Sequence, residues 1–287
     1  MYLLPYTIDA PLSPFAMNLV VDSRSILKSK CLWLNNLTQS NDSQEVLRLY
    51  QNIWEDIKAH LQNSDLDPDV VAFVAEQIEC AREPQLFSDV PFGCCFCYEN
   101  DLVQQWNEYG DRGQGVSIGF DLDWFGIRRQ CPITSVDINA AIGYEAVYYD
   151  SVSLRDRFFQ IFYQAIREEG KTAWILSILP TLKHYAGLVK NPSFRDEKEI
   201  RMLFYPCSRF QNSFPGLSSL RTNKRDHYCL DWANGSSCAM RSVTVGYACE
   251  HSPEEVVALI DRAGIAGTEN VAVNKSDCSY RSRANNI

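Results

Sequence analysis

The sequence predicts an α+β protein with a mixed or antiparallel β-sheet and flanking helices. Short apolar or alternating runs typical of strands recur along the 287 residues, and apolar residues at helical spacing lie between some of them. These runs follow one another in an uneven order, which fits neither a doubly wound parallel sheet nor a TIM barrel. Hydrophobic residues make up 46% of the chain, which is enough for one large core.

The first part of the chain alternates irregularly between helix and strand. Asn41-Asp42 provides a helix cap, and Val46, Leu49, Ile53 and Ile57 then form one helical face. Before this helix, the sequence predicts the end of a short helix at 25–29 and a strand at 31–34. After it, the predicted elements are a helix following Asp67-Pro68, a strand at 91–97, a helix capped by Asn100 or Asp101 that runs through Trp106 to Tyr109, and a strand at 116–121. Gly110, Gly113 and Gly115 lie between that helix and the strand at 116–121. A phosphate-binding loop instead follows a strand and precedes a helix, so these glycines do not form one.

The second half is expected to continue the sheet around a helical insertion. Phe158, Ile161, Phe162 and Ala165 keep a period of 3.6 residues within a helical region from Leu154 to about Val189. Further strands are predicted at 146–149, 198–205, 227–232, 242–246 and 271–273, with an irregular polar insertion after 205 and a helix at 253–263. No linker, repeat or low-complexity run divides the chain, so we expect a single α+β domain over 1–287 with a helical insertion at about 153–189.

Charge and hydropathy restrict the functional class. The formal net charge is −9 and the basic residues are dispersed, which opposes a surface that coats DNA or RNA. The N-terminal residues lack the basic and apolar regions of a signal peptide, and no window reaches transmembrane length. We therefore expect a cytoplasmic protein that does not associate with membranes.

The eleven cysteines are expected to be free thiols, because their number is odd and no export signal accompanies them. Cys94 and Cys97 have C-x-x-C spacing, but no second such pair or histidine pair completes a metal site. The aromatic residue between them favours a buried strand, where a free cysteine behaves as a small hydrophobe. No metal is predicted.

The stretch from Phe194 to Phe204 concentrates charge at the start of an apolar strand. In an extended conformation Glu197, Glu199 and Arg201 share one face, while Lys198, Ile200 and Met202 share the other. A carboxylate withdrawn from water needs a partner. One interpretation is a structural pair between Arg201 and a carboxylate at a sheet edge, and the other is a catalytic pair of acids.

Several catalytic signatures are absent, including G-x-S-x-G and H-E-x-x-H, and the four histidines lack ligand-like spacing. The sequence instead carries distant blocks: Tyr6-Thr7, Leu32-Trp33-Leu34, Asn41-Asp42 with Glu45, Phe96 to Gly110, Gly115 to Asp121, Phe194 to Arg201, and Ser276 to Arg281. Their order and spacing resemble the bacterial domain-of-unknown-function family 2971 (DUF2971), from about Tyr6 to Arg281. That family in turn is remotely similar to the ADP-ribosyltransferase fold, in which a split β-sheet holds NAD.

The resemblance implies a set of site residues. Glu199 corresponds to the catalytic glutamate, with Glu197 as its helper. The positions implied to bind NAD are Tyr6, Thr7, Cys97, Trp106, Tyr109 and Arg201. Pro5 and Cys97 depart from the histidine and serine of the common pattern. Trp106 is also typical of the core face of an amphipathic helix.

The leading hypothesis is a bacterial ADP-ribosyltransferase-like effector, of the toxin or phage-defence type, that uses NAD to modify an unidentified acceptor, a protein or a nucleic acid. Glu199 would oppose the positive charge that develops when the bond between nicotinamide and ribose breaks. An antitoxin or other partner protein is expected with such an effector. The alternative is an interaction or sensor domain that keeps the fold without the chemistry. A metal-dependent nuclease is a third class, but no recognisable D…E-x-K core supports it.

Overall fold

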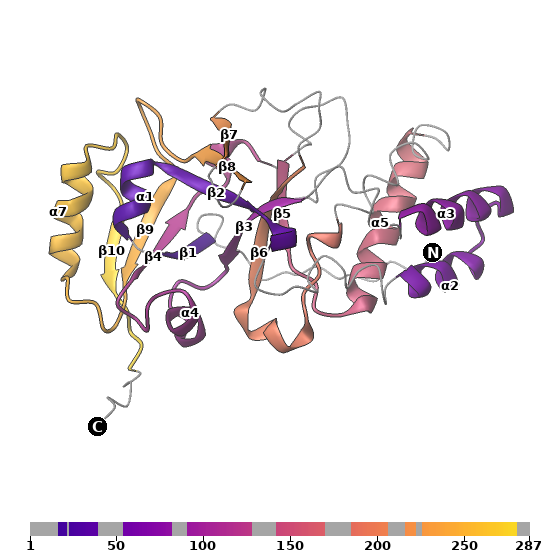
Figure 1. The fold of residues 1–287 in the computed structure, drawn as a ribbon, viewed down its shortest axis with the longest axis horizontal. Coiled ribbons are helices and arrows are strands. Elements are labelled where there is room, and N and C mark those ends of the chain that lie inside the picture. The colour runs from indigo at the N-terminus through magenta and orange to yellow at the C-terminus, as the bar shows by residue number, and fades with distance from the viewer. Residues whose placement is uncertain are drawn as a thin grey trace. The chain divides into compact units, whose positions relative to one another are not determined.

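A computed structural model describes residues 17–21, 23–39, 54–81, 91–127, 142–169, 185–205, 216–221 and 226–279. The chain divides into two compact units, each assembled from segments that are distant in sequence. Figure 1 shows the helices and strands of the described residues. The first contains Met1–Lys30, Cys97–Gly126 and Trp232–Ile287, and the second contains Cys31–Phe96 and Ile127–Asp231. Both combine strands with helices, so the predicted α+β class is confirmed.

The first unit contains a mixed sheet in the order β10-β9-β4-β1. Its strands are β1 (Met17–Val21), β4 (Val116–Phe120), β9 (Met240–Val245) and β10 (Ala272–Lys275). The neighbours pair antiparallel except β9 and β10, which are parallel. A parallel connection needs a crossover. Helix α7 (Pro253–Ala263) provides it and lies beside β10 in Figure 1.

Local signals fix α7 at both ends. The Ser252 side chain accepts a hydrogen bond from the Glu255 amide, and the Glu255 carboxylate accepts one from the Ser252 amide, which together form a capping box. Gly264 ends the helix with a φ of 60°, a conformation that glycine adopts without strain. Among the described residues of this unit, the other helices are α1 (Ser23–Ser29), α4 (Val103–Glu108) and the 3₁₀ turn η4 (Asp123–Phe125).

The second unit contains six strands among its described residues: β2 (Cys31–Asn36), β3 (Phe92–Cys97, whose last residue belongs to the first unit), β5 (Ile142–Ala146), β6 (Glu199–Phe204), β7 (Leu217–Arg221) and β8 (Asp226–Asp231). Strand β2 pairs antiparallel with both β3 and β8, and β7 extends the sheet beyond β8. Strand β6 pairs with β3 on one side and with β5 on the other, so it is internal to the sheet.

The pairing between β2 and β3 is short. Only Asn35 with Gly93 and Asn36 with Phe92 are in register, although β2 continues back to Cys31 and β3 continues forward to Cys97. The two strands therefore stop pairing beyond Asn35 and Gly93. Strand β6 differs from β2 because every one of its residues is buried.

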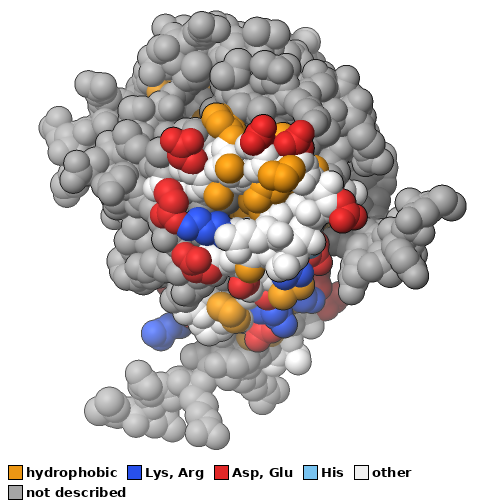
Figure 2. Space-filling model, turned by 90° about the vertical axis from the view of Figure 1, so that its right-hand side faces the viewer, with side chains coloured by type: hydrophobic (Ala, Val, Ile, Leu, Met, Phe, Trp, Pro, Cys, Tyr) orange, Lys and Arg blue, Asp and Glu red, His pale blue; other side chains and the backbone are white. Residues whose placement is uncertain are grey.

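Helices α2 (Trp54–Gln62), α3 (Pro68–Ala81) and α5 (Ser151–Glu169) also belong to this unit, with the 3₁₀ turns η1 (Leu37–Gln39) and η6 (Pro192–Glu197). The His60 ring of α2 packs 4.1 Å from the Phe159 ring of α5, and Lys58 pairs with Glu79 of α3. Figure 2 shows this side of the molecule, where acidic side chains surround a group of hydrophobic ones. The segment from α2 to α3 accounts for seven acids: Glu55, Asp56, Asp65, Asp67, Asp69, Glu76 and Glu79.

The structure confirms most of the predicted elements and corrects four details. Strand β5 lies at Ile142–Ala146 rather than 146–149, and Tyr148 forms only an isolated bridge with Val189. Helix α4 has Leu102 as its N-cap without a side-chain hydrogen bond, so neither Asn100 nor Asp101 caps it. Helix α5 spans Ser151–Glu169, residues 185 and 186 are helical again and 187–190 are not, while 170–184 of the predicted helical region lie outside the described residues. Strands β1 and β7 were not predicted. The helix predicted after Asn41-Asp42 lies, as far as residue 53, outside the residues that the structure describes.

Candidate active site around Glu199

The two predicted acids lie on different elements that meet at a sharp turn. Glu197 is the last residue of η6, whose first turn is capped by the Asn191 side chain. Lys198 follows with a φ of 48° in the left-handed region, and β6 begins only at Glu199. The prediction that Glu197 and Glu199 occupy one strand face is therefore wrong. The turn brings their carboxylates together in another way.

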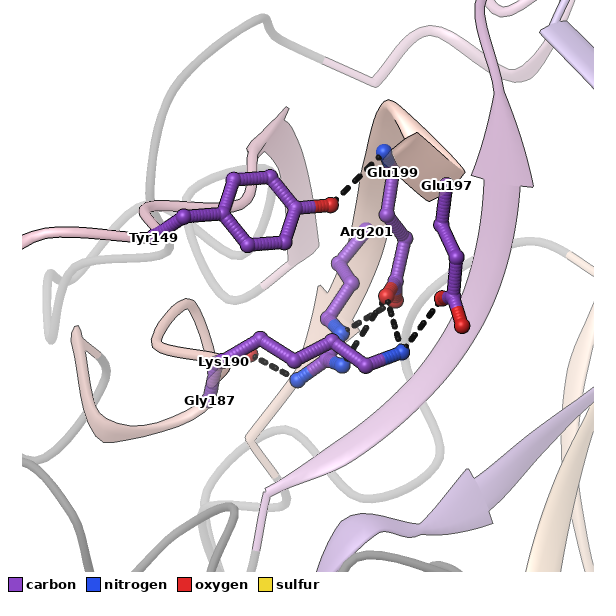
Figure 3. Close-up of polar contacts among 6 residues, drawn as sticks. All are labelled: Tyr149, Gly187, Lys190, Glu197, Glu199 and Arg201. Atoms are coloured by element: carbon purple, nitrogen blue, oxygen red, sulfur yellow. Dashed lines mark hydrogen bonds and ion pairs between the residues drawn. The ribbon is translucent and has the colours of Figure 1, made fainter. Parts of the chain in front are cut away.

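Lys190 connects the two carboxylates. Its Nζ donates to Glu197 Oε2 at 2.5 Å and to Glu199 Oε2 at 2.9 Å (Figure 3). Backbone bonds fix its position, because the Tyr148 amide donates to the Leu188 carbonyl and the Lys190 amide donates to the Tyr148 carbonyl. The ammonium also lies 4.9 Å from the centre of the Phe194 ring of η6. These contacts hold Lys190 between η6 and the segment that follows β5 and contains Tyr148.

Arg201 completes the cluster from within β6. Its Nε donates to Glu199 Oε1 at 2.6 Å, its Nη2 to Glu199 Oε2 at 3.3 Å, and its Nη1 to the Gly187 carbonyl at 2.8 Å (Figure 3). The side chain is 1% exposed. The predicted pair between Arg201 and a carboxylate is confirmed, but it lies inside the sheet and not at an edge, because β6 has a neighbour on each side.

Two further side chains contact Glu199. The Glu199 backbone amide donates to Tyr149 Oη at 3.1 Å, and the Cys95 thiol of β3 donates to the Glu199 carboxylate. Burial raises the pKa of Tyr149 to about 12, although the hydrogen bond from the Glu199 amide lowers it. Burial, followed by the charge of Glu199, raises the pKa of Cys95 well above its ordinary value, although its side chain still reaches solvent. Cys95 is therefore a neutral donor.

The cluster moves the pKa values of its two acids in opposite directions. Burial alone would raise the pKa of Glu199, but the charge and hydrogen bonds of Arg201, then the charge of Lys190, lower it to about 2. For Glu197 the effect of burial exceeds that of Lys190, so its pKa is raised. Lys190 stays protonated, because Glu199 and Glu197 overcome the lowering effect of burial on its pKa. Two acids of different basicity therefore share one ammonium.

All six residues drawn in Figure 3 lie in one stretch of sequence that has counterparts in other proteins. Residues 105–202 match the family model of DUF2971, described as a protein of unknown function. This range contains Tyr149, Gly187, Lys190, both acids and Arg201, and it is shorter than the resemblance from Tyr6 to Arg281 expected from the sequence. No curated protein and no solved structure matches the chain.

The DUF2971 match also includes two of the predicted NAD-binding residues, Trp106 and Tyr109, both in the first unit. Trp106 is 0% exposed and donates its Nε1 proton to Asp101 at 2.7 Å, as a core tryptophan does. Tyr109 is the C-cap of α4 and half exposed. Cys97 is buried at the end of β3, where it pairs with Asn18 of β1. Tyr6 and Thr7 lie outside the described residues.

Lys190, Tyr149 and Cys95 were not predicted from the sequence as partners of Glu199. Lys190 follows an apolar run and precedes Asn191-Pro192, and nothing in that local pattern indicates a carboxylate partner. The backbone bonds to Tyr148 determine its position. Among the described residues, no group of three or more His, Cys, Asp or Glu is arranged to hold a metal ion, and no helix has the length and apolar character to cross a membrane.

Proposed function

We propose that the protein cleaves NAD and transfers its ADP-ribosyl group to an acceptor, with Glu199 and Glu197 as the catalytic acids. The observation that carries this proposal is the pair of carboxylates around Lys190 with pKa values moved in opposite directions. Such separation is typical of sites that use two carboxylates in different roles. Glycosidic bond cleavage is one reaction that uses a pair of carboxylates in this way.

Each acid has a distinct task in this mechanism. The bond between C1 of the ribose and the nicotinamide nitrogen breaks, and neutral nicotinamide leaves with the electron pair. The ionised Glu199 stabilises the oxocarbenium-like ribose, because a fixed negative charge lowers the energy of the developing cation. The acceptor then forms a bond to C1 and loses its proton to Glu197, whose raised pKa makes it the stronger base.

Access to Glu199 depends on the weakest of its hydrogen bonds. Its side-chain oxygens, which are almost fully buried, accept from Arg201 Nε and Nη2, from Lys190 and from Cys95. A thiol is a weaker donor than an ammonium or guanidinium group. A ribose hydroxyl would therefore replace Cys95, the exposed member of this set, while the two cations keep Glu199 ionised.

Labelled NAD tests the proposal directly. Wild-type protein is incubated with NAD and cell lysate, and nicotinamide release and transfer of label are measured against Glu199→Gln. We expect the rate of the variant to be about 10²–10³-fold lower, which is the loss typical of removing one preorganised electrostatic group. Glu145→Gln is the matched control, since Glu145 is a buried carboxylate of β5 paired with Arg157 at 2.8 Å. Neither cleavage nor transfer by the wild type would overturn the proposal.

One observation favours the second candidate, an interaction or sensor domain without catalysis. Glu199 is 4% exposed and its acceptor positions are already filled, as in a purely structural network. For this function, calorimetry would detect no NAD binding and a host or phage protein would co-purify. A growth defect on expression that Glu199→Gln relieves would contradict it.

The wider context is part of the same proposal. An enzyme of this kind would act as a bacterial effector in toxin or phage-defence systems, in the cytoplasm, with a protein or nucleic acid as acceptor and an antitoxin as partner. The chain's net charge of −9 favours a transient encounter with a nucleic-acid acceptor over stable coating.

A further inference from the structure

The hydroxyl of Tyr149 contacts Glu199 and keeps a proton to donate. Its oxygen accepts a hydrogen bond from the Glu199 amide at 3.1 Å, and the described residues provide no acceptor for its own O–H group. Because burial raises the pKa of Tyr149 to about 12, this hydroxyl is protonated at neutral pH. A phenol hydroxyl can accept one hydrogen bond and donate another at the same time. The site therefore holds a neutral donor that is available to a ligand.

Strand pairing determines the side from which Tyr149 reaches Glu199. The Val147 amide donates to the Glu199 carbonyl at 3.0 Å, so the chain still runs alongside Glu199 beyond the end of β5. Strand β6 lies between β5 and β3, and Cys95 reaches Glu199 from β3. Figure 3 shows Tyr149 and Glu197 on opposite sides of Glu199. Tyr149 thus approaches from the side of β5, away from Cys95 and Glu197.

The proposed reaction assigns different groups to these two sides. The acceptor loses its proton to Glu197, so it approaches C1 of the ribose from the side of that carboxylate. In a displacement with inversion, the attacking and leaving groups lie on opposite faces of the sugar ring. The leaving nicotinamide therefore lies on the side of Tyr149.

We propose that Tyr149 recognises the leaving nicotinamide by donating its hydroxyl proton to the carboxamide oxygen. This inference rests on the proposed function, because it identifies the residue that selects the leaving group of that reaction. The ring nitrogen of NAD is bonded to the ribose and cannot accept a hydrogen bond, so the carboxamide oxygen is the main acceptor on the ring.

One substrate can reach both Tyr149 and the Glu199 carboxylate. The Tyr149 hydroxyl lies 3.1 Å from the amide nitrogen of the same residue whose carboxylate would face C1. The remaining separation is the length of a glutamate side chain, and a nicotinamide ribosyl group is longer than that. Tyr149 is also half-buried, whereas Glu199 is 4% exposed, so the hydroxyl lies on the more accessible side of the cluster.

The test uses probes that differ in their hydrogen-bonding groups. 1-Methylnicotinamide has the whole carboxamide, 3-acetyl-1-methylpyridinium keeps the carbonyl oxygen without the amino group, and 1-methylpyridinium has neither. Each cation is titrated by calorimetry and by tryptophan fluorescence into wild type, Tyr149→Phe and Tyr144→Phe. Tyr144 of β5 is the matched control, because it is also half-buried and lies opposite Met202, on the sheet face away from Arg201. Circular dichroism confirms that each variant is folded.

We expect Tyr149→Phe to raise the Kd of the two probes that carry a carbonyl about tenfold, because one hydrogen bond is lost, and to leave that of 1-methylpyridinium unchanged. Tyr144→Phe should bind all three probes as the wild type does. If Tyr149 only supported the Glu199 amide, Tyr149→Phe would weaken the three probes equally, and that result would overturn the inference. Equal binding of 1-methylnicotinamide and 1-methylpyridinium to the wild type, or no binding of the former, would overturn it without any variant.

Turnover of NAD provides a second readout. The hydrogen bond to the carboxamide forms in the bound substrate and persists while the bond from C1 to nitrogen breaks. Tyr149→Phe should therefore raise KM and leave kcat unchanged, whereas Glu199→Gln should lower kcat. A Tyr149→Phe variant with the KM of the wild type would contradict the inference.

The two proposals fail in distinguishable ways. Selective binding of the carbonyl probes that depends on Tyr149, without any nicotinamide release from NAD, supports this inference and overturns the catalytic proposal. Nicotinamide release that Glu199→Gln abolishes, together with unchanged probe selectivity in Tyr149→Phe, supports catalysis and overturns this inference.

Discussion

At the scale of single residues, Lys190 is the side chain on which the Glu199 cluster depends. Replacing it with Met would leave two buried carboxylates without the ammonium they share. Removal of one partner of a buried ion pair costs about 3–5 kcal/mol. We therefore expect Lys190→Met to lower the free energy of unfolding by at least about 3 kcal/mol in urea at pH 7.

Arg155→Met is the control for this measurement. Arg155 pairs with Asp156, which is 61% exposed, and an exposed pair contributes about 1 kcal/mol or less. If Lys190→Met and the wild type unfold at the same urea concentration, the cluster does not stabilise the fold.

Acid titration separates the two carboxylates, because their pKa values move in opposite directions. The pKa of Glu199 falls from 4.5 to about 2, so its contribution is complete above 4.5 and is lost as pH falls toward 2. Over that window the stability difference between wild type and Glu199→Gln should shrink by about 3 kcal/mol. The raised pKa of Glu197 has the opposite sign, since protonation of Glu197 favours the folded state. Urea denaturation at successive pH values measures both, and a pH-independent difference for Glu199→Gln would contradict this assignment.

The reactivity of Cys95 reports the charge of Glu199. Burial, then the charge of Glu199, raises the pKa of the thiol, and the thiolate is the form that reacts with alkylating agents. We expect Glu199→Gln to lower that pKa and to accelerate alkylation of Cys95 by iodoacetamide at pH 8. Mass spectrometry of the peptide that contains Cys95 measures the rate. Glu145→Gln should leave the rate unchanged, and slower alkylation in Glu199→Gln would show that Cys95 does not sense this carboxylate.

At the scale of elements, glycines are decisive where two backbones approach closely. A Cβ on Gly246, which follows β9, would lie 2.2 Å from the Gly113 carbonyl oxygen and 2.9 Å from that of Gly115. Neither backbone atom moves without breaking the bonds that Gly246 and Ala248 donate to this loop. Gly246→Ala should therefore destabilise the protein by more than about 3 kcal/mol, within the range of severe steric substitutions.

Gly235 provides the matched comparison for Gly246. No neighbouring atom lies within 4 Å of a Cβ built on Gly235, so Gly235→Ala should shift the unfolding midpoint little. Thermal unfolding of both variants makes the measurement. Equal midpoints for the two variants would mean that the loop adapts to a side chain at 246.

The elements that the sequence predicted well have their signals within their own residues. Helix α7 was predicted with its observed bounds, and the structure shows that Ser252, Glu255 and Gly264 mark its ends. Strand β5 was displaced because the pattern around Tyr148 resembles a strand, whereas pairing with β6 selects Ile142–Ala146. The strand predicted from Lys198 begins one residue later, at Glu199, because Lys198 adopts a left-handed turn that nothing in the local sequence indicates.

At the scale of the whole molecule, the site could be predicted only in part. Glu199 and Arg201 are two residues apart on one strand, so their pairing followed from alternation alone. Lys190 and Cys95 reach Glu199 through strand pairing and backbone bonds between distant segments, and such contacts leave no local pattern. The division into two units, whose segments alternate along the chain, could not be predicted from the sequence either, because no change in composition marks the boundaries.

The net charge of the whole chain predicts how ligands approach. The formal charge is −9, and seven acids lie along the segment from α2 to α3. Long-range repulsion slows an anionic ligand, and salt screens it with a Debye length that falls from about 30 Å at 0.01 M to about 8 Å at 0.15 M. We therefore expect the association rate constant of NAD to rise with salt over this range. The rate constant of 1-methylnicotinamide, a cation, should fall.

Stopped-flow tryptophan fluorescence measures both rates with the same protein, so the cation serves as the internal control for the anion. Opposite salt dependences would identify the charge of the molecule as their cause, because a change in structure with salt would move both rates in one direction. A rate for NAD that falls as salt rises would instead reveal a local positive field strong enough to dominate the net charge of −9. Lys190→Met would then test whether the ammonium that holds Glu199 is the source of that field, since Lys190 and Arg201 are the cations of the cluster and Arg201 is 1% exposed.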